Sequence, residues 1–212
     1  MRRMLTLVAA LAFVALIAMP AQAQEKSSVR FGIQGGITSS SITGDDVPDE
    51  GISSKTGFWA GGKFNYFFAQ NWSVAMEANW LSGLGAKFTS GSFETETKIS
   101  YFAFPVTINF AFPLGENEKT WIGLASGFTT MLRLTCDVTD NDLGSSSEDC
   151  KDDSESTAFA VPFSAMLGFK ATDSAVVYLG ARYQLGLTEI AKDVDWKLNW
   201  WEFTLGVGFP TG

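Results

Sequence analysis

The stretch from Ser100 to Phe112 alternates with a period of two residues, and this constrains the fold more than any other feature. Its even-numbered positions from 102 to 112 are all phenylalanine, valine or isoleucine. Its odd-numbered positions, which include Tyr101 and Pro105, are smaller or polar. Such alternation predicts a β-strand with one apolar face and one mixed face. At about 3.4 Å per residue, a tilted strand of this length crosses the hydrocarbon of a bilayer.

Most of the chain repeats this design. Alternating segments also cover residues 29–37, 57–68, 72–84, 121–134, 159–170, 177–187 and 200–209. With the first stretch, they amount to about eight strands, each with one apolar row and one mixed row.

The connections between these segments fall into two kinds. Short ones (69–71, 113–119 and 172–174) alternate with long polar ones (38–55, 83–97, 135–156 and 188–195). Bacterial outer-membrane barrels combine short periplasmic turns with long external loops. The sequence therefore predicts an all-β fold, a closed antiparallel transmembrane β-barrel of about eight strands with short periplasmic turns and long extracellular loops.

Aromatic residues cluster near both ends of the predicted strands, as expected for belts at the two membrane interfaces. Near the short turns the predicted belt contains Tyr66, Phe68, Trp72, Phe112, Trp121 and Phe209. Near the long loops it contains Phe58, Trp80, Trp196, Trp200 and Trp201.

The N-terminal segment has the pattern of a secretory signal peptide. Two arginines precede an apolar run from Leu5 to Met19, and Ala21 and Ala23 supply the small residues of a cleavage site. We expect cleavage after Ala23, leaving residues 24–212 as one outer-membrane β-barrel domain. No later segment is apolar enough for a spanning helix, and lipid offers backbone groups no hydrogen-bond partners, so spanning strands must close into a barrel.

Charge and composition exclude several classes of function. The net charge is −8, and removing the two arginines of the signal peptide makes the chain more acidic still. Nucleic acid is therefore not an expected partner, because phosphates require basic surface. The chain has no histidine, so Ser–His and Asp–His catalytic pairs and histidine-ligated metals are excluded. We expect no enzymatic activity and no cofactor.

Four charged residues fall on the mixed face by the same alternation, and we expect them in the lumen. They are Lys63, Glu77, Arg182 and Glu202, with Arg30 and Arg133 as candidate partners. An eight-stranded barrel is just filled by its side chains, so buried charges there must pair. We predict a salt-bridged plug in which Arg182 pairs with Glu202 on an adjacent strand, with a proton or solute path as the alternative.

Two prolines and two cysteines carry further predictions. Pro105 and Pro162 lie inside strands, where proline lacks a ladder donor, so we expect a β-bulge at each. Cys136 and Cys150 flank an acidic segment of an exported chain, which predicts one disulfide closing that loop. The segment 140–144 matches a calcium loop only in part. Diffuse divalent bridging between acidic loops and lipopolysaccharide is the favoured interpretation.

The sequence also resembles a known family. The stretch Tyr101-Phe-Ala-Phe-Pro-Val-Thr-Ile-Asn-Phe110 resembles the Tyr-Leu-x-Ile-Pro-Leu core of PorT-like outer-membrane β-barrel domains. The Gly32-Ile-Gln-Gly-Gly36 segment and the glycines at 123 and 127 resemble other strands of those domains, whereas the residues after Phe209 depart from the usual aromatic end. The resemblance implies an eight-stranded outer-membrane barrel and assigns no catalytic residue or ligand.

Three classes of function remain. The favoured one is a monomeric structural or surface-interaction barrel in the bacterial outer membrane, contacting lipid, lipopolysaccharide or a protein partner through its acidic external loops. A soluble lipocalin-like barrel that binds a small apolar ligand is the main alternative, and it requires the apolar rows to face inward. A barrel enzyme acting on lipid or peptide is less favoured, because no catalytic pair is placed by the sequence.

Overall fold

The computed structural model describes residues 28–45, 47, 51–90, 93–115, 119–140, 146–150, 154–192 and 194–211. The expected signal peptide, residues 1–23, lies outside this range. Among the described residues, no helix has the length and apolar character needed to cross a membrane.

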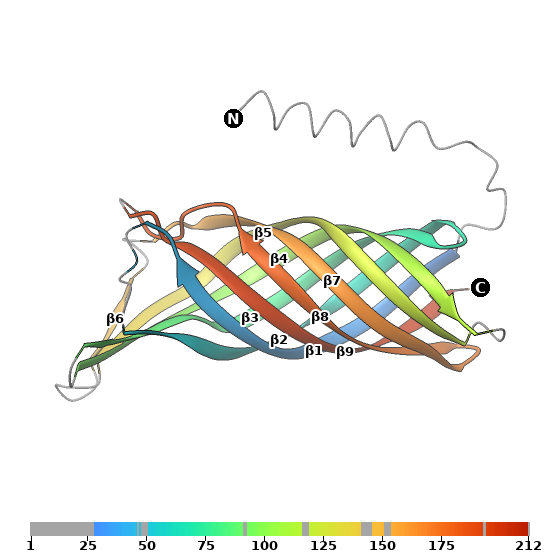
Figure 1. Ribbon diagram of the computed structural model, residues 1–212, viewed down its shortest axis with the longest axis horizontal. Helices are drawn as coiled ribbons and strands as arrows, with labels where there is room; N and C mark the ends of the chain where they lie inside the picture. Colours follow the sequence, from blue (N-terminus) through green and yellow to red (C-terminus); the bar gives the residue numbers. More distant parts are fainter. Residues whose placement is uncertain are drawn as a thin grey trace, which may run out of the picture.

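Nine antiparallel strands make up the described chain, and eight of them close into a barrel. The strands are β1 (Ser28–Thr43), β2 (Ile52–Ala69), β3 (Trp72–Ser90), β4 (Phe93–Leu114), β5 (Thr120–Asp140), β6 (Ser146–Asp149), β7 (Thr157–Thr172), β8 (Ala175–Gly186) and β9 (Lys197–Thr211). Each barrel strand pairs with its neighbours in the chain, and β1 with β9 completes the ring. The short β6 pairs with β5 beyond the barrel wall (Figure 1).

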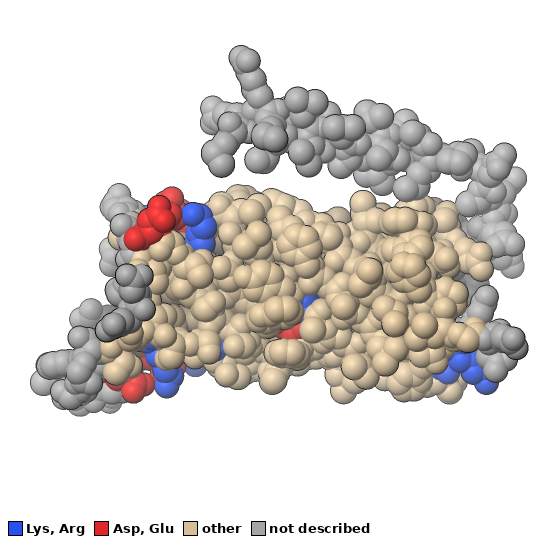
Figure 2. Space-filling model, viewed as in Figure 1, with Lys and Arg blue, Asp and Glu red and all other residues tan. Residues whose placement is uncertain are grey.

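The alternation of β4 places its two rows on opposite sides of the wall, as predicted. Phe102, Phe104, Val106 and Ile108 are each more than a third exposed on the outside, whereas Tyr101 is completely buried inside. The space-filling view shows charged side chains at the two ends of the barrel and a nearly uncharged wall between them (Figure 2). The lipocalin-like alternative, which needs the apolar rows inside, is therefore wrong.

The two aromatic belts are confirmed in part. Phe58, Tyr66, Trp72, Trp80, Phe112, Trp201 and Phe209 are exposed on the outer wall. Trp200 is only 1% exposed and lies inside, Trp196 packs against the buried core, and Trp121 lines a pocket in the lumen. Trp121 fits there because Gly168 leaves room for its ring, since a Cβ at this glycine would lie 2.2 Å from the indole.

The segment 83–97, predicted to be a loop, is instead a hairpin. β3 continues to Ser90 and β4 begins at Phe93, with regular pairs from Leu84↔Ile99 to Ser90↔Phe93. The segment 135–156 is likewise partly strand, because β5 reaches Asp140 and β6 follows. Threonine favours strands, whereas serine and glycine are typical of loops. A prediction from composition alone therefore assigned these segments to loops.

The predicted bulges at Pro105 and Pro162 are wrong. Met76↔Val106 and Asn79↔Ala103 keep one register on both sides of Pro105, and Ser126↔Phe163 and Thr129↔Ala160 keep one register on both sides of Pro162. A proline lacks the backbone N–H, so one hydrogen bond to one of the two neighbouring strands is missing. The pairing with the other neighbouring strand continues in register through both prolines. The register shifts lie elsewhere, among them Leu81/Leu84 in β3 and Ser100/Tyr101 in β4.

The outward rows predict a position-dependent effect of charge. Leu205, 63% exposed in the middle of β9, should face the centre of the bilayer, so Leu205→Arg should lower the free energy of unfolding by about 2–4 kcal/mol. Leu114→Arg at the short-turn end of β4 should cost about 1 kcal/mol or less. Urea unfolding in lipid vesicles measures both. Equal losses would contradict the assigned membrane position.

Candidate functional site

The lumen has three levels, and the level at the long-loop end is apolar. Inward-facing residues of the barrel and residues of the loop between β8 and β9 form one buried cluster there. It contains Ile42, Trp59, Leu81, Leu84, Ala86, Ile99, Tyr101, Ala103, Met131, Cys136, Ala158, Ala160, Ile190, Leu198 and Trp200. Tyr101 of the motif strand thus belongs to this apolar level, and Pro105 faces the same lumen further along β4.

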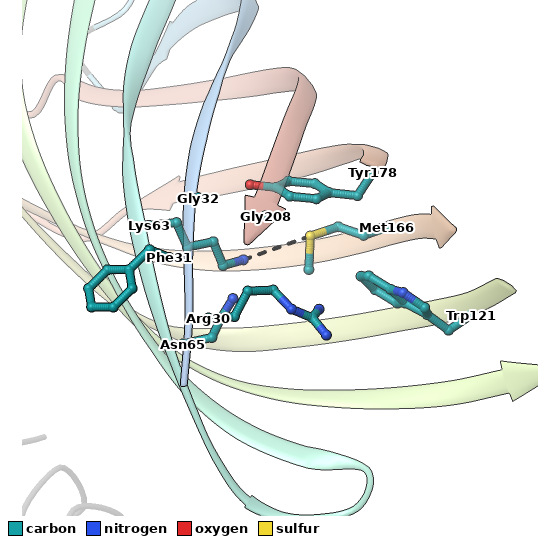
Figure 3. Close-up of a pocket in the computed structure, with 9 residues that line it drawn as sticks. All are labelled: Arg30, Phe31, Gly32, Lys63, Asn65, Trp121, Met166, Tyr178 and Gly208. Carbon is teal, nitrogen blue, oxygen red and sulfur yellow. Dashed lines mark hydrogen bonds between the residues drawn. The ribbon is translucent and has the colours of Figure 1, made fainter. Parts of the chain in front are cut away.

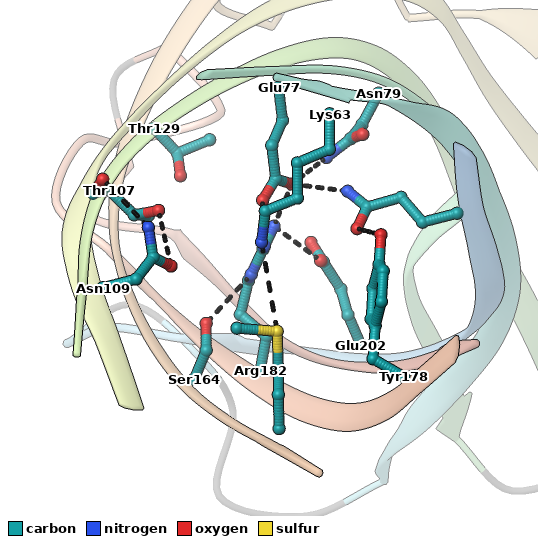
Figure 4. A network of polar contacts seen from close by, with 12 residues as sticks. Lys63, Glu77, Asn79, Thr107, Asn109, Thr129, Ser164, Tyr178, Arg182 and Glu202 are labelled. Atoms are coloured by element: carbon teal, nitrogen blue, oxygen red, sulfur yellow. Dashed lines mark hydrogen bonds and ion pairs between the residues drawn. The ribbon is translucent and has the colours of Figure 1, made fainter. Parts of the chain in front are cut away.

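Glu77 is the centre of the second level, near the middle of the barrel. Arg182 donates to both of its oxygens, at 2.6 and 2.8 Å, which is the bidentate geometry that makes such pairs strong. Gln34 and Asn79 donate to its Oε2 at 2.7 and 3.0 Å, and Lys63 lies 3.4 Å from its Oε1. Figure 4 shows Lys63, Asn79 and Arg182 converging on Glu77 inside the ring of strands.

Arg182 links Glu77 to the second buried carboxylate. Its Nη1 lies 3.3 Å from Oε2 of Glu202, across the β8–β9 pair that sets these residues opposite each other, and its Nε donates to Ser164 at 3.1 Å. Glu202 Oε1 accepts from Gln184 at 3.1 Å and from Trp200 at 2.8 Å. The structure therefore brings all four predicted lumen residues together, with the expected Arg182–Glu202 contact.

Gln34, Tyr178 and Gln184 fall on the mixed face of their strands by the same two-residue alternation, but sequence reasoning did not single them out. Tyr178 donates to Gln34 at 3.1 Å, and Thr129 donates to Gln184 at 3.0 Å, so neutral side chains extend the ionic network. Their signal was the same two-residue parity that identified the charges. A neutral polar side chain, however, does not require an oppositely charged partner, so the alternation alone gave no reason to expect these residues in the network.

The third level, at the short-turn end, is a cavity of about 290 Å³. Arg30 and Lys63 line it together with Trp121, Met166 and residues of the β2–β3 turn. Arg133, the other candidate partner, lies at the opposite end, where it contacts Ser154 and donates to the Glu155 carbonyl at 3.3 Å. Of the two arginines, only Arg30 is therefore near the charge network.

The strand ends and connections at the long-loop end form an outer rim, which we define as the described residues of 44–55, 82–100, 135–155 and 187–196. Lys55 pairs with Glu96 there, and Lys87 pairs with Glu94 at 3.3 Å. The hydrogen bond from the Lys55 ammonium holds the pKa of the Glu96 carboxyl below its ordinary value. Phe88 stacks on Trp196 with ring centroids 5.5 Å apart, which joins the β3–β4 hairpin to the β8–β9 loop.

The predicted disulfide lies in this outer rim. Cys136 of β5 is bonded to Cys150, which follows β6, so the bond holds the β5–β6 hairpin together beside its pairs Asp137↔Asp149 to Asp140↔Ser146. Most of the partial calcium motif, residues 141–144, lies outside the described residues. Within the described part of the chain, no group of three or more acidic or cysteine side chains is arranged to hold a metal.

Comparison with known proteins agrees with this architecture. Residues 9–209 match the family described as "Outer membrane protein beta-barrel domain". The chain belongs to this family. Members of the outer membrane protein beta-barrel domain family sit in the bacterial outer membrane, which places this protein there and agrees with its uncharged wall. Among proteins with curated descriptions, no sequence matches the chain.

Two solved structures share the fold. Neisserial surface protein A is 15% identical, with a TM-score of 0.50, and the alignment covers 84% of this chain and 96% of that one. OprG from Pseudomonas aeruginosa is also 15% identical, with a TM-score of 0.52, covering 90% of this chain and 99% of that one. At this identity the similarity concerns the barrel fold alone.

The ionic network predicts a large penalty for removing its central carboxylate. Glu77→Gln leaves Arg182 and Lys63 buried with Glu202 as their one carboxylate, and should lower the free energy of unfolding by about 3–5 kcal/mol. Ser164→Ala, which removes one hydrogen bond to Arg182, should cost about 1 kcal/mol. Urea unfolding in vesicles compares the two. Similar losses would show that Glu77 is not the centre of the network.

Proposed function

We propose that this protein is a monomeric structural or surface-interaction barrel, and that its outer rim is the working surface. The barrel anchors the rim, and the rim contacts lipopolysaccharide through divalent cations or a protein partner outside the cell. The similarity of Tyr101–Phe110 and Gly32–Gly36 to PorT-like domains supports placing the chain in that branch of its family.

One observation carries this proposal: the outer rim is built as a connected surface. The backbone N–H of Thr89 donates to Gly51 at 2.7 Å, and that of Glu155 donates to Ile190 at 3.0 Å, so connections from different hairpins are tied together. The disulfide and the Lys55–Glu96 pair add further links. A pre-organised surface binds with a smaller entropic cost than separate mobile loops do.

The charge of the outer rim supports a cation-bridged or basic partner. Asp45, Glu155 and Glu189 are exposed at this end, and the sequences of the long connections contain many more acidic than basic residues. Lipopolysaccharide is itself anionic, so divalent cations between the two surfaces reconcile their charges. Carboxylates are the oxygen ligands that Ca²⁺ and Mg²⁺ use in proteins.

A barrel enzyme is less well supported. The chain lacks histidine, and the buried carboxylates Glu77 and Glu202 are both engaged by Arg182 within the network. A carboxylate held in this way accepts hydrogen bonds on the oxygens that a general base needs for its substrate. We therefore propose a binding role without catalysis.

Lipopolysaccharide binding by the protein in phospholipid nanodiscs, with calcium or with a chelator, tests this role. Calcium should strengthen binding to wild type. Asp45→Asn/Glu155→Gln/Glu189→Gln should weaken it roughly tenfold, since exposed charges contribute about 0.3–0.5 kcal/mol each. The matched control, Glu116→Gln/Glu118→Gln/Asp173→Asn, removes as many charges from the connections between β4 and β5 and between β7 and β8, and should leave binding unchanged. The same affinity for lipopolysaccharide with calcium and with the chelator, or an equal loss of affinity in the two variants, would refute the cation-bridged contact.

The disulfide should matter to the rim and not to the barrel. Cys136→Ser/Cys150→Ser removes a loop closure of about 3 kcal/mol, so protease should cleave the segment 137–149 faster than in wild type. The heat-dependent shift in gel migration, which reports the closed barrel, should stay unchanged. Loss of that shift would mean that the bond is needed for the barrel itself.

A further inference from the structure

The cavity at the short-turn end of the lumen carries more positive than negative charge. Arg30 and Lys63 both line it, and none of the lining residues that the structure describes is acidic. Figure 3 shows a smaller pocket that shares Arg30, Lys63, Trp121 and Met166 with this cavity. In it the guanidinium of Arg30 and the ammonium of Lys63 extend toward Met166 and Trp121, while Phe31 points away from them.

Lys63 is only partly neutralised by Glu77. Arg182 occupies both oxygens of that carboxylate at 2.6 and 2.8 Å, whereas Lys63 lies at 3.4 Å. The ammonium also lies 3.9 Å from the sulfur of Met166, which is a weak acceptor, and 5.8 Å from the centre of the Tyr178 ring. Lys63 therefore keeps unused hydrogen-bond donors beside the cavity.

Arg30 has no carboxylate partner among the described residues. Its buried Nε has no hydrogen-bond acceptor there, and its guanidinium lies 4.9 Å from the centre of the Phe67 ring. Gly208 makes room for its stem, because a Cβ at that glycine would lie 2.8 Å from Cδ of Arg30. The wall is thus shaped to hold an arginine that has no carboxylate partner in the described part of the chain.

Counting the interior charges gives the same result. Among the described residues of the middle and short-turn levels, Arg30, Lys63 and Arg182 are positive, and Glu77 and Glu202 are negative, which leaves one positive charge in excess there. A buried charge without a counterion costs several kcal/mol, and a bound anion offsets that cost. The excess lies at the cavity, since Arg182 is the cation that the two carboxylates share.

We propose that this cavity binds a small organic carboxylate that enters from the periplasmic end. The planar guanidinium of Arg30 donates hydrogen bonds to the carboxylate, and the ammonium of Lys63 supplies a second positive charge. Amide and hydroxyl groups of Asn65, Asn109 and Ser73 add polar contacts, and Trp121 contacts the apolar body of the ligand. A volume of about 290 Å³ lies at the small end of the range for ligand pockets, which limits the body to about one ring.

Benzoate and its neutral counterpart benzamide are suitable probes, because they differ in charge and little in shape. The readout is the indole N–H signal of Trp121 in ¹⁵N-labelled protein in zwitterionic micelles, assigned by its loss in Trp121→Phe. Benzoate should shift this signal saturably, and benzamide should bind at least about tenfold more weakly, as expected when a charge-assisted hydrogen bond is lost.

Three variants separate the cavity from general charge effects. Arg30→Gln should weaken benzoate binding at least about tenfold. Ser73→Leu, which fills the cavity and keeps both cations, should weaken it too. Lys119→Gln removes an exposed charge from the same end of the barrel and should leave binding unchanged. Each variant is first shown by its heat-dependent gel shift to form the barrel.

Three results would overturn the assignment: benzoate and benzamide binding equally, Arg30→Gln and Ser73→Leu both binding like wild type, or Lys119→Gln losing as much affinity as Arg30→Gln. If Arg30→Gln does not form the barrel, Ser73→Leu alone decides between the outcomes. None of these results depends on lipopolysaccharide binding at the outer rim, so the two proposals fail separately.

Discussion

The structure depends on one constraint, which is that backbone N–H and C=O groups find no partners in hydrocarbon. Eight strands satisfy it by closing into a ring in which β1 pairs with β9 and every barrel strand has two neighbours. Closure then fixes the direction of every side chain, because successive residues of a strand face opposite sides of the wall. The apolar rows of β4 and β9 face outward for this reason, and Glu77 and Arg182 have no other place than the lumen.

A ring of eight strands leaves an interior that is just filled by side chains. Two solutions to that packing coexist here. Near the long loops the space is filled by apolar groups such as Trp59, Tyr101 and Trp200. Near the middle it is filled by charges that neutralise one another around Glu77. Toward the short turns the filling is incomplete, and the cavity between Arg30 and Trp121 remains. The two ends of one small barrel therefore offer different chemistry, an acidic rim outside and a basic cavity inside.

Alternation predicted the wall well and the connections poorly, for a physical reason. The rows of residues 102–112 report the side of the sheet directly, since one face meets lipid and the other does not. Residues 83–97 lie beyond the bilayer, where no such contrast exists, and their Ser/Gly content concealed a regular hairpin. Pro105 was expected to break the register, but only one of its two neighbouring strands meets the missing donor, so the register holds. Trp121 was assigned to a belt because its position near a turn was visible, whereas the glycine that admits it to the lumen lies on another strand.

By itself, the sequence determined the class of fold, the number of barrel strands, the side of the wall for Lys63, Glu77, Arg182 and Glu202 and the pairing of its two cysteines, because each follows from a local period or from a small count. The tertiary structure alone decided which charges meet. Arg182 comes from β8 and Glu77 from β3, strands on different parts of the ring that alternation cannot place relative to each other. It also decided that Arg30 has no carboxylate among the described residues, which depends on the three-dimensional positions of every acidic group around it.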